Sequence, residues 1–336
     1  MKPLLVIVLA TAAIAVAEQP KRPASAYSKP KAASVKPRAA GLNPKAVNDP
    51  AAPIPTANGS SALRAQILLD RAGYSSGEID GTLGTNTTRA LKAYQRTHDL
   101  PATGRMDRAT WSALNTEASP VLVAYTIGAE DVKGPFVEIP ADMMEKSKLA
   151  HLGYASALEG LAEKFHCSPH VLKALNPQAT FDNAGEELLV PSVRAPRTAR
   201  AAKVVVSKSE STVSAFNAQG KLIAQYPASI GSQHDPLPVG QWKITGVATK
   251  PIFNYSPDLF WDASPEHAKA VIQAGPNNPV GVVWIDLSKP HYGIHGTPEP
   301  SNVGHTQSHG CIRLTNWDAQ ELAGMVTKGI PAILKE

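Results

Sequence analysis

The sequence has little cysteine, few aromatic residues and little charge. Among its 336 residues there are two cysteines, 6% aromatic residues and 18% charged residues. Charged and aromatic fractions this low are unusual for a compact cytosolic enzyme, whereas the apolar fraction of 43% is enough to form cores. Collagen-like and wholly disordered chains are therefore excluded, and a chain of this length is expected to form two or three domains.

Long apolar runs are also absent, since no segment approaches the roughly 18 uninterrupted apolar residues of a membrane helix. One shorter run, Leu4 to Ile14, follows Lys2 and precedes Ala15-Val16-Ala17, which is the layout of a cleavable export signal. We expect residues 1–17 to be removed and the mature protein to reach the periplasm or cell wall. No cysteine lies near the cut, so no lipid anchor is expected. Because the apolar runs are short, no transmembrane segment is expected either.

The net charge of +5 comes from one segment near the N-terminus. Residues 18–57 carry seven Lys and Arg against two acidic residues, whereas residues 58–336 carry 25 basic against 26 acidic residues. The folded part is therefore nearly neutral, which argues against nucleic acid as a partner. Residues 18–58 are mainly Ala, Pro, Lys and Ser, and we predict a disordered linker that loosely contacts anionic envelope polymers or lipid head groups.

Residues 59–118 are predicted to form three short helices. Apolar stripes occur near Leu63, Leu91 and Trp111, the last behind Asp107 as a helix N-cap, and turn signals lie between them. The run IDGTLGTNTTRALKAYQ followed by LPATGRMDRATWSAL resembles the three-helix type of peptidoglycan-binding domain. The resemblance implies binding to cell wall, and the alternative is a helical spacer that binds nothing. Removal of residues 59–116 should weaken wall binding more than turnover of a soluble peptide, and equal loss of both would show that this module is part of the active site.

Residues 121–193 follow the order strand, helix, helix, strand, with Ser168 as the predicted cap of the second helix. The runs AEKFHCSPHVLKALNP and GEELLVP are similar to a lysin motif, a glycan-binding module. About 25 residues between Gly128 and Tyr154 occupy the place of a short turn in that family. Glycan strands are thus a candidate partner, and a packing module without affinity for sugars is the alternative.

The C-terminal part, residues 203–336, is predicted to be mainly β. Short apolar or alternating runs are separated by turn signals such as Asn217 to Gly220, and only Asp318 to Val326 has a helical pattern. The whole chain is therefore predicted to be a multidomain α+β protein with a small three-helix module, a small lysin-motif-like module and a mainly β domain.

The densest cluster of polar side chains lies between His291 and Arg313 and contains Cys311. A thiol attacks an acyl carbon only as the thiolate, so a catalytic cysteine needs a nearby base or a positive local field. Gly310 allows a substrate backbone to approach closely, and the N–H groups of Gly310 and Cys311 are candidate donors to a developing oxyanion. Two motifs, IHG at 294–296 and SHGCIRL at 308–314, lie downstream of the run PLPVGQWKI.

These motifs resemble the L,D-transpeptidase catalytic domain family over roughly residues 203–335. The resemblance implies that Cys311 is the nucleophile and that His295 is the general base. It further implies that the backbone carbonyl of Gly296 fixes the tautomer of the His295 imidazole, as a carboxylate does in other enzymes.

The same resemblance implies substrate contacts for the residues around the nucleophile. Ser308, His309 and Gly310 are expected to shape the pocket and its hydrogen bonds. Arg313 is expected to hold a substrate carboxylate through two hydrogen bonds or to brace the loop, although some members of the family carry asparagine there.

The implied reaction is a ping-pong acyl transfer on peptidoglycan tetrapeptide stems, with one stem as donor and another as acceptor. Cys311 forms a thioester with release of D-Ala, and the acceptor amine then completes a 3→3 cross-link. Water as acceptor would make the protein an L,D-carboxypeptidase, and a lipoprotein lysine would make it an anchoring enzyme. No metal or nucleotide cofactor is expected.

Other interpretations of the same residues remain open at this stage. A non-catalytic wall-binding protein would retain the fold without the reaction. A zinc amidase or peptidase would use four histidines, but the glycines and prolines between them argue against the helix that an i, i+4 spacing needs. Those histidines are His291, His295, His305 and His309.

The two cysteines and an aromatic cluster each allow two interpretations. Cys167 and Cys311 form a disulfide, or Cys167 is a buried apolar side chain in another module. The aromatic residues form a lid over the cleft or pack in the core, and they are Phe253, Tyr255, Phe260 and Trp261.

Overall fold

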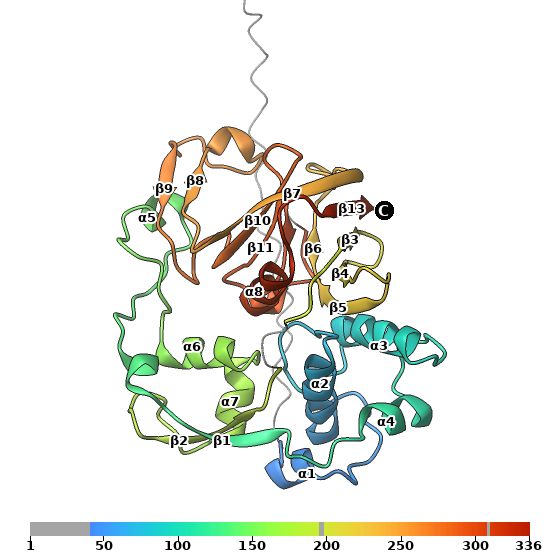
Figure 1. Cartoon of the computed structure of the whole chain (residues 1–336). Coiled ribbons are helices and arrows are strands. Elements are labelled where there is room, and N and C mark those ends of the chain that lie inside the picture. The colour runs from blue at the N-terminus through green and yellow to red at the C-terminus, as the bar shows by residue number, and fades with distance from the viewer. Residues whose placement is uncertain (1–40, 195–197, 308–309) are drawn as a thin grey trace, which may run out of the picture. The chain divides into compact units, whose positions relative to one another are not determined.

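The structure is a computed structural model that describes residues 41–194, 198–307 and 310–336 (Figure 1). Helices dominate the N-terminal half and strands the C-terminal half, which confirms the multidomain α+β fold predicted from the sequence. The export signal predicted at 1–17 and most of the predicted linker lie outside the described residues. No helix among the residues described is both long enough and apolar enough to cross a membrane.

The N-terminal module contains the three predicted helices. Asp107 caps the third by accepting a hydrogen bond of 2.8 Å from the Thr110 N–H, as predicted, and Gly73 ends the first with a positive φ of 89°. The apolar stripes of the three helices meet in one core. The helices are α2 (Ser60–Ala72), α3 (Thr85–Thr97) and α4 (Arg108–Leu114).

The predicted disordered linker, 18–58, is too long at its C-terminal end. A short helix, α1 (Pro44–Asn48), packs against α2, and its Val47 is fully buried. The Asn48 Oδ1 accepts hydrogen bonds from the Val121 and Leu122 N–H groups at 2.9 and 2.7 Å. The side chains of Val47 and Asn48 thus attach this stretch to the fold. The average composition of residues 18–58 does not show this, because it is dominated by the other residues of the segment.

The middle module has the predicted order of strand, helix, helix and strand. The two strands pair antiparallel, with Leu122 opposite Pro191, and Ser168 caps the second helix by accepting from the Val171 N–H at 3.1 Å, as predicted. The elements are β1 (Leu122–Thr126), α6 (Ala157–Lys164), α7 (Pro169–Leu175) and β2 (Glu187–Pro191).

Residues 128–154, which we call the insert, lie between β1 and α6 and contain η1 (Ala129–Val132) and α5 (Met143–Lys146). The fully buried Leu152 packs with Tyr255 and Ile272 of the C-terminal domain. The Leu152 N–H donates to the Ala274 carbonyl at 3.2 Å. The insert is therefore attached to the C-terminal domain by apolar and backbone contacts.

The C-terminal domain contains a nine-stranded mixed sheet within the described residues, in the order β5-β4-β3-β13-β7-β10-β11-β12-β6. The β3–β13 and β11–β12 pairs are parallel and the other pairs are antiparallel. These strands are β3 (Lys203–Ser207), β4 (Thr212–Phe216), β5 (Leu222–Pro227), β6 (Ser229–Ile230), β7 (Gly240–Thr249), β10 (Val283–Leu287), β11 (Gly293–His295), β12 (Ile312–Arg313) and β13 (Pro331–Lys335).

Smaller elements complete this domain. Helix α8 (Asn316–Met325) packs against β10 and β11, and Thr315 caps it by accepting from the Asp318 N–H at 3.2 Å. This cap starts the helix two residues earlier than the apolar pattern predicts. The strands β8 (Phe253–Tyr255) and β9 (Ala270–Ile272) form a separate hairpin, and two short 3₁₀ helices are η2 (Pro257–Leu259) and η3 (Pro300–Asn302).

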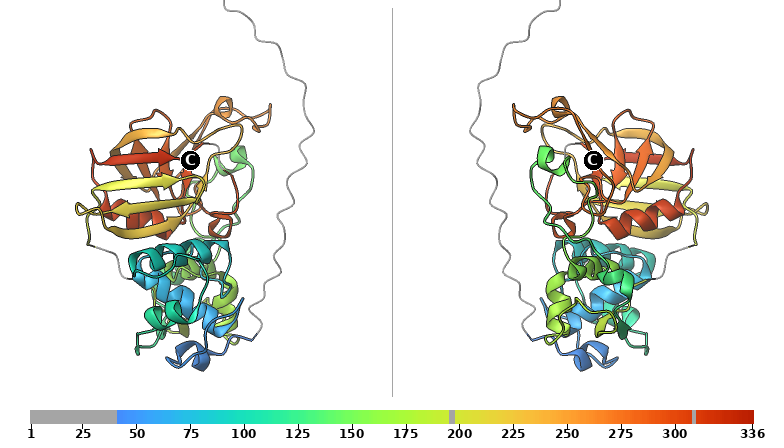
Figure 2. Two further views of the ribbon diagram at one scale, coloured as in Figure 1. Left: turned by 90° about the vertical axis from the view of Figure 1, so that its right-hand side faces the viewer. Right: turned by 90° about the vertical axis from the view of Figure 1, so that its left-hand side faces the viewer.

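The helical module and the middle module share one apolar core, whereas the sheet has another. The Ile79 N–H donates to the His166 carbonyl and the Ser168 N–H donates to the Ile79 carbonyl, which joins the two modules through their backbones. Helix α3 lies along β5 of the sheet, where the Gln225 Nε2 donates to the Arg89 carbonyl at 3.1 Å (Figure 2).

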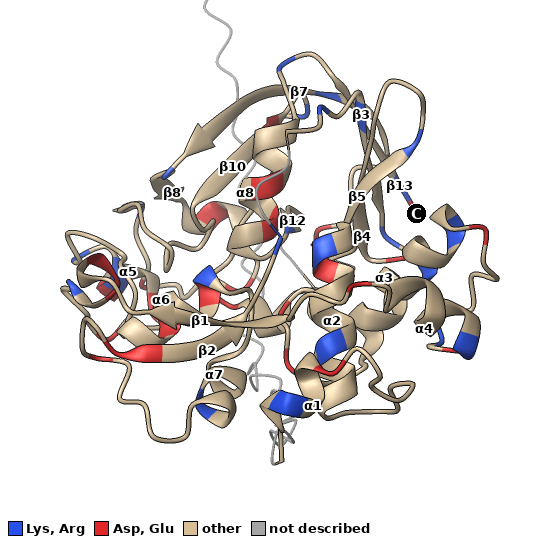
Figure 3. Ribbon diagram, turned by 60° about the horizontal axis from the view of Figure 1, so that its bottom comes forward, with Lys and Arg blue, Asp and Glu red and all other residues tan. Residues whose placement is uncertain are grey.

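A buried ionic cluster joins the helical module to the C-terminal domain. The Arg194 side chain is 4% exposed and contacts the carboxylates of Asp70, Asp318 and Glu321, the last two at 2.6 and 2.7 Å. Two of the three acids lie on α8, which carries red segments in Figure 3. Because each charge is desolvated, the cluster stabilises the fold only while all its partners remain in place.

Candidate functional site

The two motifs that carry the predicted chemistry lie on neighbouring strands. Strands β11 and β12 are parallel, with Ile294 opposite Ile312 and His295 opposite Arg313. Cys311 immediately precedes β12, so the parallel register places it beside Gly293 at the start of β11, two residues before His295. The Cys311 Sγ lies 3.8 Å from the His291 carbonyl oxygen.

The His295 imidazole is held in one tautomer. Its side chain is buried, and its Nδ1 lies 2.7 Å from the Gly296 carbonyl oxygen. Because a carbonyl only accepts, Nδ1 carries the proton and Nε2 keeps a free lone pair. Burial, with the positive charge of Arg313, lowers the pKa of His295 to about 3, so the ring is neutral at physiological pH. The Trp284 ring stacks on it at 5.3 Å between ring centroids.

The Cys311 thiol must lose its proton to react, but its surroundings favour the protonated form. Burial raises its pKa above the ordinary value, and Asp235 acts in the same direction, whereas a backbone hydrogen bond from Gly293 and the charge of Arg313 favour the thiolate. The resting side chain is therefore a thiol, which needs a base at the moment of attack. A neutral imidazole with a free lone pair is such a base.

Two glycines border these groups closely. Gly310 has a φ of +90°, and a Cβ there would lie 3.1 Å from the Tyr292 ring. At Gly296 a Cβ would lie 2.2 Å from the Asn316 Oδ1, so the Asn316 side chain packs directly against the backbone that fixes His295. The structure thus brings together Cys311, His295, Gly296, Gly310 and Arg313, whereas Ser308 and His309 lie outside the described residues.

Arg313 lies in β12 within an acidic environment. Burial lowers its pKa, and Cys311, Glu299 and Asp262 each favour its charged form. A guanidinium beside a nucleophile attracts a substrate carboxylate and stabilises a thiolate. Asp235, Glu299 and Asp262 were not identified from the sequence, because they come from separate loops that only the fold brings near β12.

The structure decides between the two interpretations of the cysteines. No disulfide joins the two cysteines in the structure described, and Cys167 is buried in the core shared by the helical and middle modules. The interpretation of Cys167 as a buried apolar side chain is confirmed, and its burial raises the pKa of the thiol well above the ordinary value. Among the residues that the structure describes, no group of three or more His, Cys, Asp or Glu side chains could hold a metal ion.

The aromatic cluster divides between the two interpretations. Phe253, Tyr255 and Phe260 pack with Leu152 in a small core, with ring centroids 5.4 to 6.3 Å apart. Trp261, by contrast, is 47% exposed and stacks on His234 at 4.4 Å. The loop of His234 also carries Asp235, whose charge acts on Cys311. Of these four aromatic residues, Trp261 is therefore the one that is exposed and contacts a loop beside the nucleophile.

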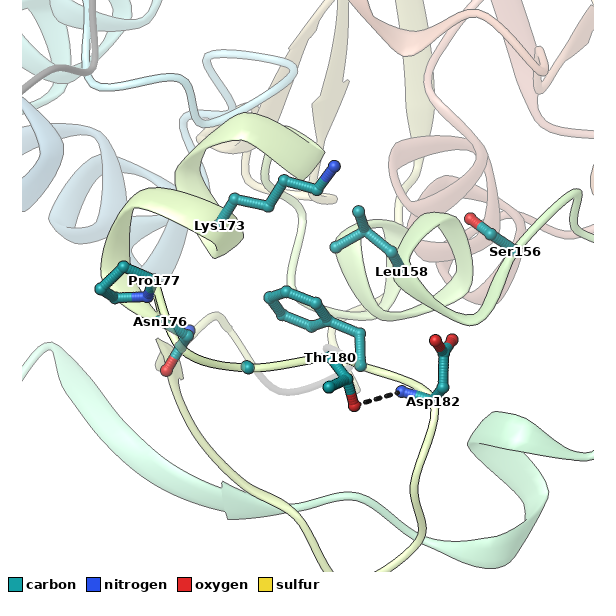
Figure 4. Close-up of a pocket in the computed structure, with 9 residues that line it drawn as sticks. Ser156, Leu158, Lys173, Asn176, Pro177, Thr180 and Asp182 are labelled. Atoms are coloured by element: carbon teal, nitrogen blue, oxygen red, sulfur yellow. Dashed lines mark hydrogen bonds between the residues drawn. The ribbon is translucent and has the colours of Figure 1, made fainter.

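A pocket lies in the middle module, apart from the residues around Cys311 (Figure 4). The pocket has a volume of about 450 Å³ and is formed by α6, α7 and the loop that follows α7. Its polar groups include Lys173, Asn176 and Asp182, and Leu158 and Phe181 supply apolar surface. Polar groups make up at least half of its lining, so it suits a ligand that forms hydrogen bonds. No local sequence pattern indicates these residues as a ligand site, since the groups converge from separate elements.

Comparisons with known proteins match two regions of the chain. The L,D-transpeptidase catalytic domain matches residues 201–334, and the "Putative peptidoglycan binding domain" matches residues 58–114. "Putative L,D-transpeptidase YkuD" of Bacillus licheniformis is 31% identical over 174 residues, which cover 51% of this chain and 89% of that protein. Its namesake in Bacillus subtilis is 29% identical over 173 residues, with the same coverage of both chains.

Solved structures are more distant. The crystal structure of L,D-transpeptidase 3 from Mycobacterium tuberculosis is 18% identical, with a TM-score of 0.34, and the match covers 46% of this chain and 76% of that chain. The family assignment rests instead on the sequence matches, since a relative more than 30% identical is covered over most of its length. The chain belongs to the L,D-transpeptidase family, and its N-terminal helices match a peptidoglycan-binding domain.

Proposed function

We propose that the protein is an exported L,D-transpeptidase that forms 3→3 cross-links between peptidoglycan stem peptides through a thioester on Cys311. The observation that supports it most directly is the 2.7 Å contact between the His295 Nδ1 and the Gly296 carbonyl, on the strand next to Cys311. This contact leaves the His295 Nε2 free to accept the thiol proton.

The reaction proceeds in two acyl transfers. The His295 Nε2 takes the Cys311 proton while Sγ attacks the carbonyl carbon of the third residue of a donor tetrapeptide. The C–N bond then breaks, and D-Ala leaves with the proton from His295. In the second transfer an acceptor amine attacks the thioester, gives its proton to His295, and releases Cys311 as the thiol. The N–H groups of Gly310 and Cys311 are our candidates for the oxyanion donors.

The remaining parts of the chain place the enzyme on its polymer. We assign wall binding to the helical module and a glycan strand to the pocket of about 450 Å³ in the middle module. Arg313 is assigned to a stem carboxylate, since its guanidinium suits a planar anionic partner. Ser308 and His309 are assigned to shaping the catalytic pocket around Cys311 and its hydrogen bonds, and residues 1–17 to the export signal.

Intact-protein mass spectrometry tests this proposal. The mature chain is mixed with a disaccharide-tetrapeptide, alone and then with an acceptor stem. We expect a covalent adduct that lacks one D-Ala, absent in Cys311→Ala, and a cross-linked dimer when the acceptor is added. A free tripeptide instead of the dimer would identify a carboxypeptidase, and transfer only to a lysine peptide would identify an anchoring enzyme. No adduct from folded, reduced protein would favour a wall-binding protein without catalysis.

A further inference from the structure

A hydrogen bond connects the middle module to the residue that supports the catalytic loop. Asn316, at the start of α8, is 1% exposed, and its Nδ2 donates to the Glu163 Oε1 on α6 at 2.8 Å. The same Nδ2 also lies 3.1 Å from the Pro276 carbonyl oxygen, while the Oδ1 accepts from the Val282 N–H at 3.3 Å. The amide is therefore held at both ends, and Glu163 supplies the partner that comes from outside the C-terminal domain.

The held amide defines where the Gly296 backbone lies. A Cβ at Gly296 would be 2.2 Å from the Asn316 Oδ1, and a Cβ at Gly281 would be 2.1 Å from the same atom. Neither glycine position therefore has room for a Cβ beside the Asn316 side chain. Because the Gly296 carbonyl accepts the His295 Nδ1 proton, movement of Asn316 displaces the group that orients the base.

Helix α6 is itself anchored beside Glu163. The Tyr154 hydroxyl donates to the Glu163 Oε2 at 3.3 Å. A few residues away, the Asn277 Nδ2 donates to the Glu159 Oε1 and to the Gly153 carbonyl, both at 2.9 Å. Helix α6 therefore offers two separate side-chain contacts to the C-terminal domain, through Glu159 and Glu163, of which only the Glu163 contact reaches Asn316.

We propose that Glu163 of the middle module is a positioning residue for acyl transfer, acting through Asn316 on the Gly296 carbonyl and so on the His295 tautomer. This inference rests on the proposed function of Cys311 and His295. It makes the middle module part of the catalytic unit and not only a binding accessory.

Four variants in the full chain test the proposal. Glu163→Asp keeps the charge but is one methylene shorter, and Glu163→Leu removes the acceptor. Glu163→Gln keeps an oxygen at the same distance. Glu159→Ala, the matched control, breaks the neighbouring contact to Asn277 without touching Asn316. Each variant is first checked for folding by circular dichroism, and the Asp variant keeps the test readable if the Leu variant unfolds.

The rate of acyl-enzyme formation should fall about tenfold in Glu163→Asp and Glu163→Leu, with little change in KM, because orientation of the base affects the chemical step. Glu163→Gln should recover most of this rate, and Glu159→Ala should stay within about twofold of wild type. Equal rates in Asp, Leu and wild-type proteins would overturn the proposal. So would an equal loss in Glu159→Ala, since that would indicate a general effect of the module interface.

Two further measurements separate this proposal from the proposed function. Alkylation of Cys311 by iodoacetamide, followed by peptide mapping, reports thiol activation without a peptide substrate. NMR of protein labelled with ¹⁵N-histidine reports the protonated nitrogen of His295. We expect slower alkylation and a smaller Nδ1-protonated fraction in Glu163→Asp. If wild type forms no acyl-enzyme but the variants shift these two signals, the proposed substrate is wrong and the positioning role stands. Unchanged signals overturn the positioning role.

Discussion

At the scale of single residues, the pair of Cys311 and His295 is neutral at rest. Burial raises the pKa of the thiol and lowers that of the imidazole to about 3, so a thiolate–imidazolium pair is not the ground state. The proton must move during attack, which makes the orientation of His295 more important than a high thiolate population.

This neutral pair predicts a flat pH profile. Between pH 5 and pH 8 the imidazole stays neutral, because this range lies above its pKa, and the thiol stays protonated, because its pKa lies above the ordinary value. The rate of acyl-enzyme formation should therefore change little across the range. His295→Ala should lose about 10² to 10⁴ in rate and then gain rate with rising pH, as free thiolate accumulates. Mass spectrometry of the acyl-enzyme measures these rates. A tenfold rise in the wild-type rate per pH unit would contradict the prediction.

Glu163 makes a second residue-scale prediction, on stability. Burial raises its pKa from 4.5 to about 7, so the folded protein binds this proton more tightly than the unfolded chain. Below pH 4.5 both states are protonated and the group has no effect. As pH rises from 4.5 to 7 only the unfolded chain releases the proton freely, so folding stability is lost across that window and stays low above it.

Glu163→Gln removes this penalty while keeping the oxygen that Asn316 contacts. Its free energy of unfolding should exceed that of wild type at pH 8 by roughly 3 kcal/mol at most, and the difference should vanish near pH 4. Urea unfolding at the two pH values measures it. A variant that is less stable than wild type at pH 8 would show that the carboxylate is stabilised by its surroundings.

At the scale of helices and strands, local signals in the sequence predicted most of the elements. Asp107 and Ser168 cap the helices predicted for them, because a cap depends on a few adjacent residues. The parallel pairing of β3 with β13 joins residues more than 100 positions apart, and no local pattern encodes it. The short helix at 44–48 was missed because its burial depends on partners at 121 and 122.

Some residues of the candidate site could also be predicted from local sequence and others could not. Cys311 and His295 lie in dense local motifs, so the sequence indicated both as candidates, whereas the pairing of their strands is known only from the structure. Asn316 and Glu163 were missed because they are 153 positions apart and act through one contact between modules. A residue that supports a site from another domain has no local signature, and only the fold reveals it.

The insert makes a prediction at the element scale. Gly275 has a φ of +152°, and a Cβ there would lie 2.0 Å from the Leu152 carbonyl oxygen. Gly275→Ala should therefore separate the insert from the loop that follows β9 and destabilise the protein by several kcal/mol. Hydrogen exchange should increase in residues 128–154 and in the β8–β9 hairpin.

Gly246→Ala is the control for this change, because a Cβ at Gly246 in β7 meets nothing within 4 Å. Its free energy of unfolding should stay within about 0.5 kcal/mol of wild type. If both variants exchange like wild type, the insert is not held by the contact at Gly275.

At the scale of the whole molecule, the chain is not a row of independent domains. The helical and middle modules share one apolar core, and Arg194 joins Asp70 of α2 to Asp318 and Glu321 of α8. Removal of one partner from a buried ionic cluster costs about 3 to 5 kcal/mol, because the remaining charges stay desolvated. Because the modules share a core and an ionic cluster, deletion of one module is expected to disturb the folding of the others.

The sequence predicted that loss of residues 59–116 would weaken wall binding more than turnover of a soluble stem. The structure predicts a different outcome, since the deletion would expose the shared core and leave Arg194 without Asp70. We expect the truncated chain to lose activity on the soluble stem as well, together with its cooperative unfolding transition, measured by circular dichroism and by acyl-enzyme formation. A truncated chain that unfolds cooperatively and acylates at the wild-type rate would show that the helical module is an independent unit.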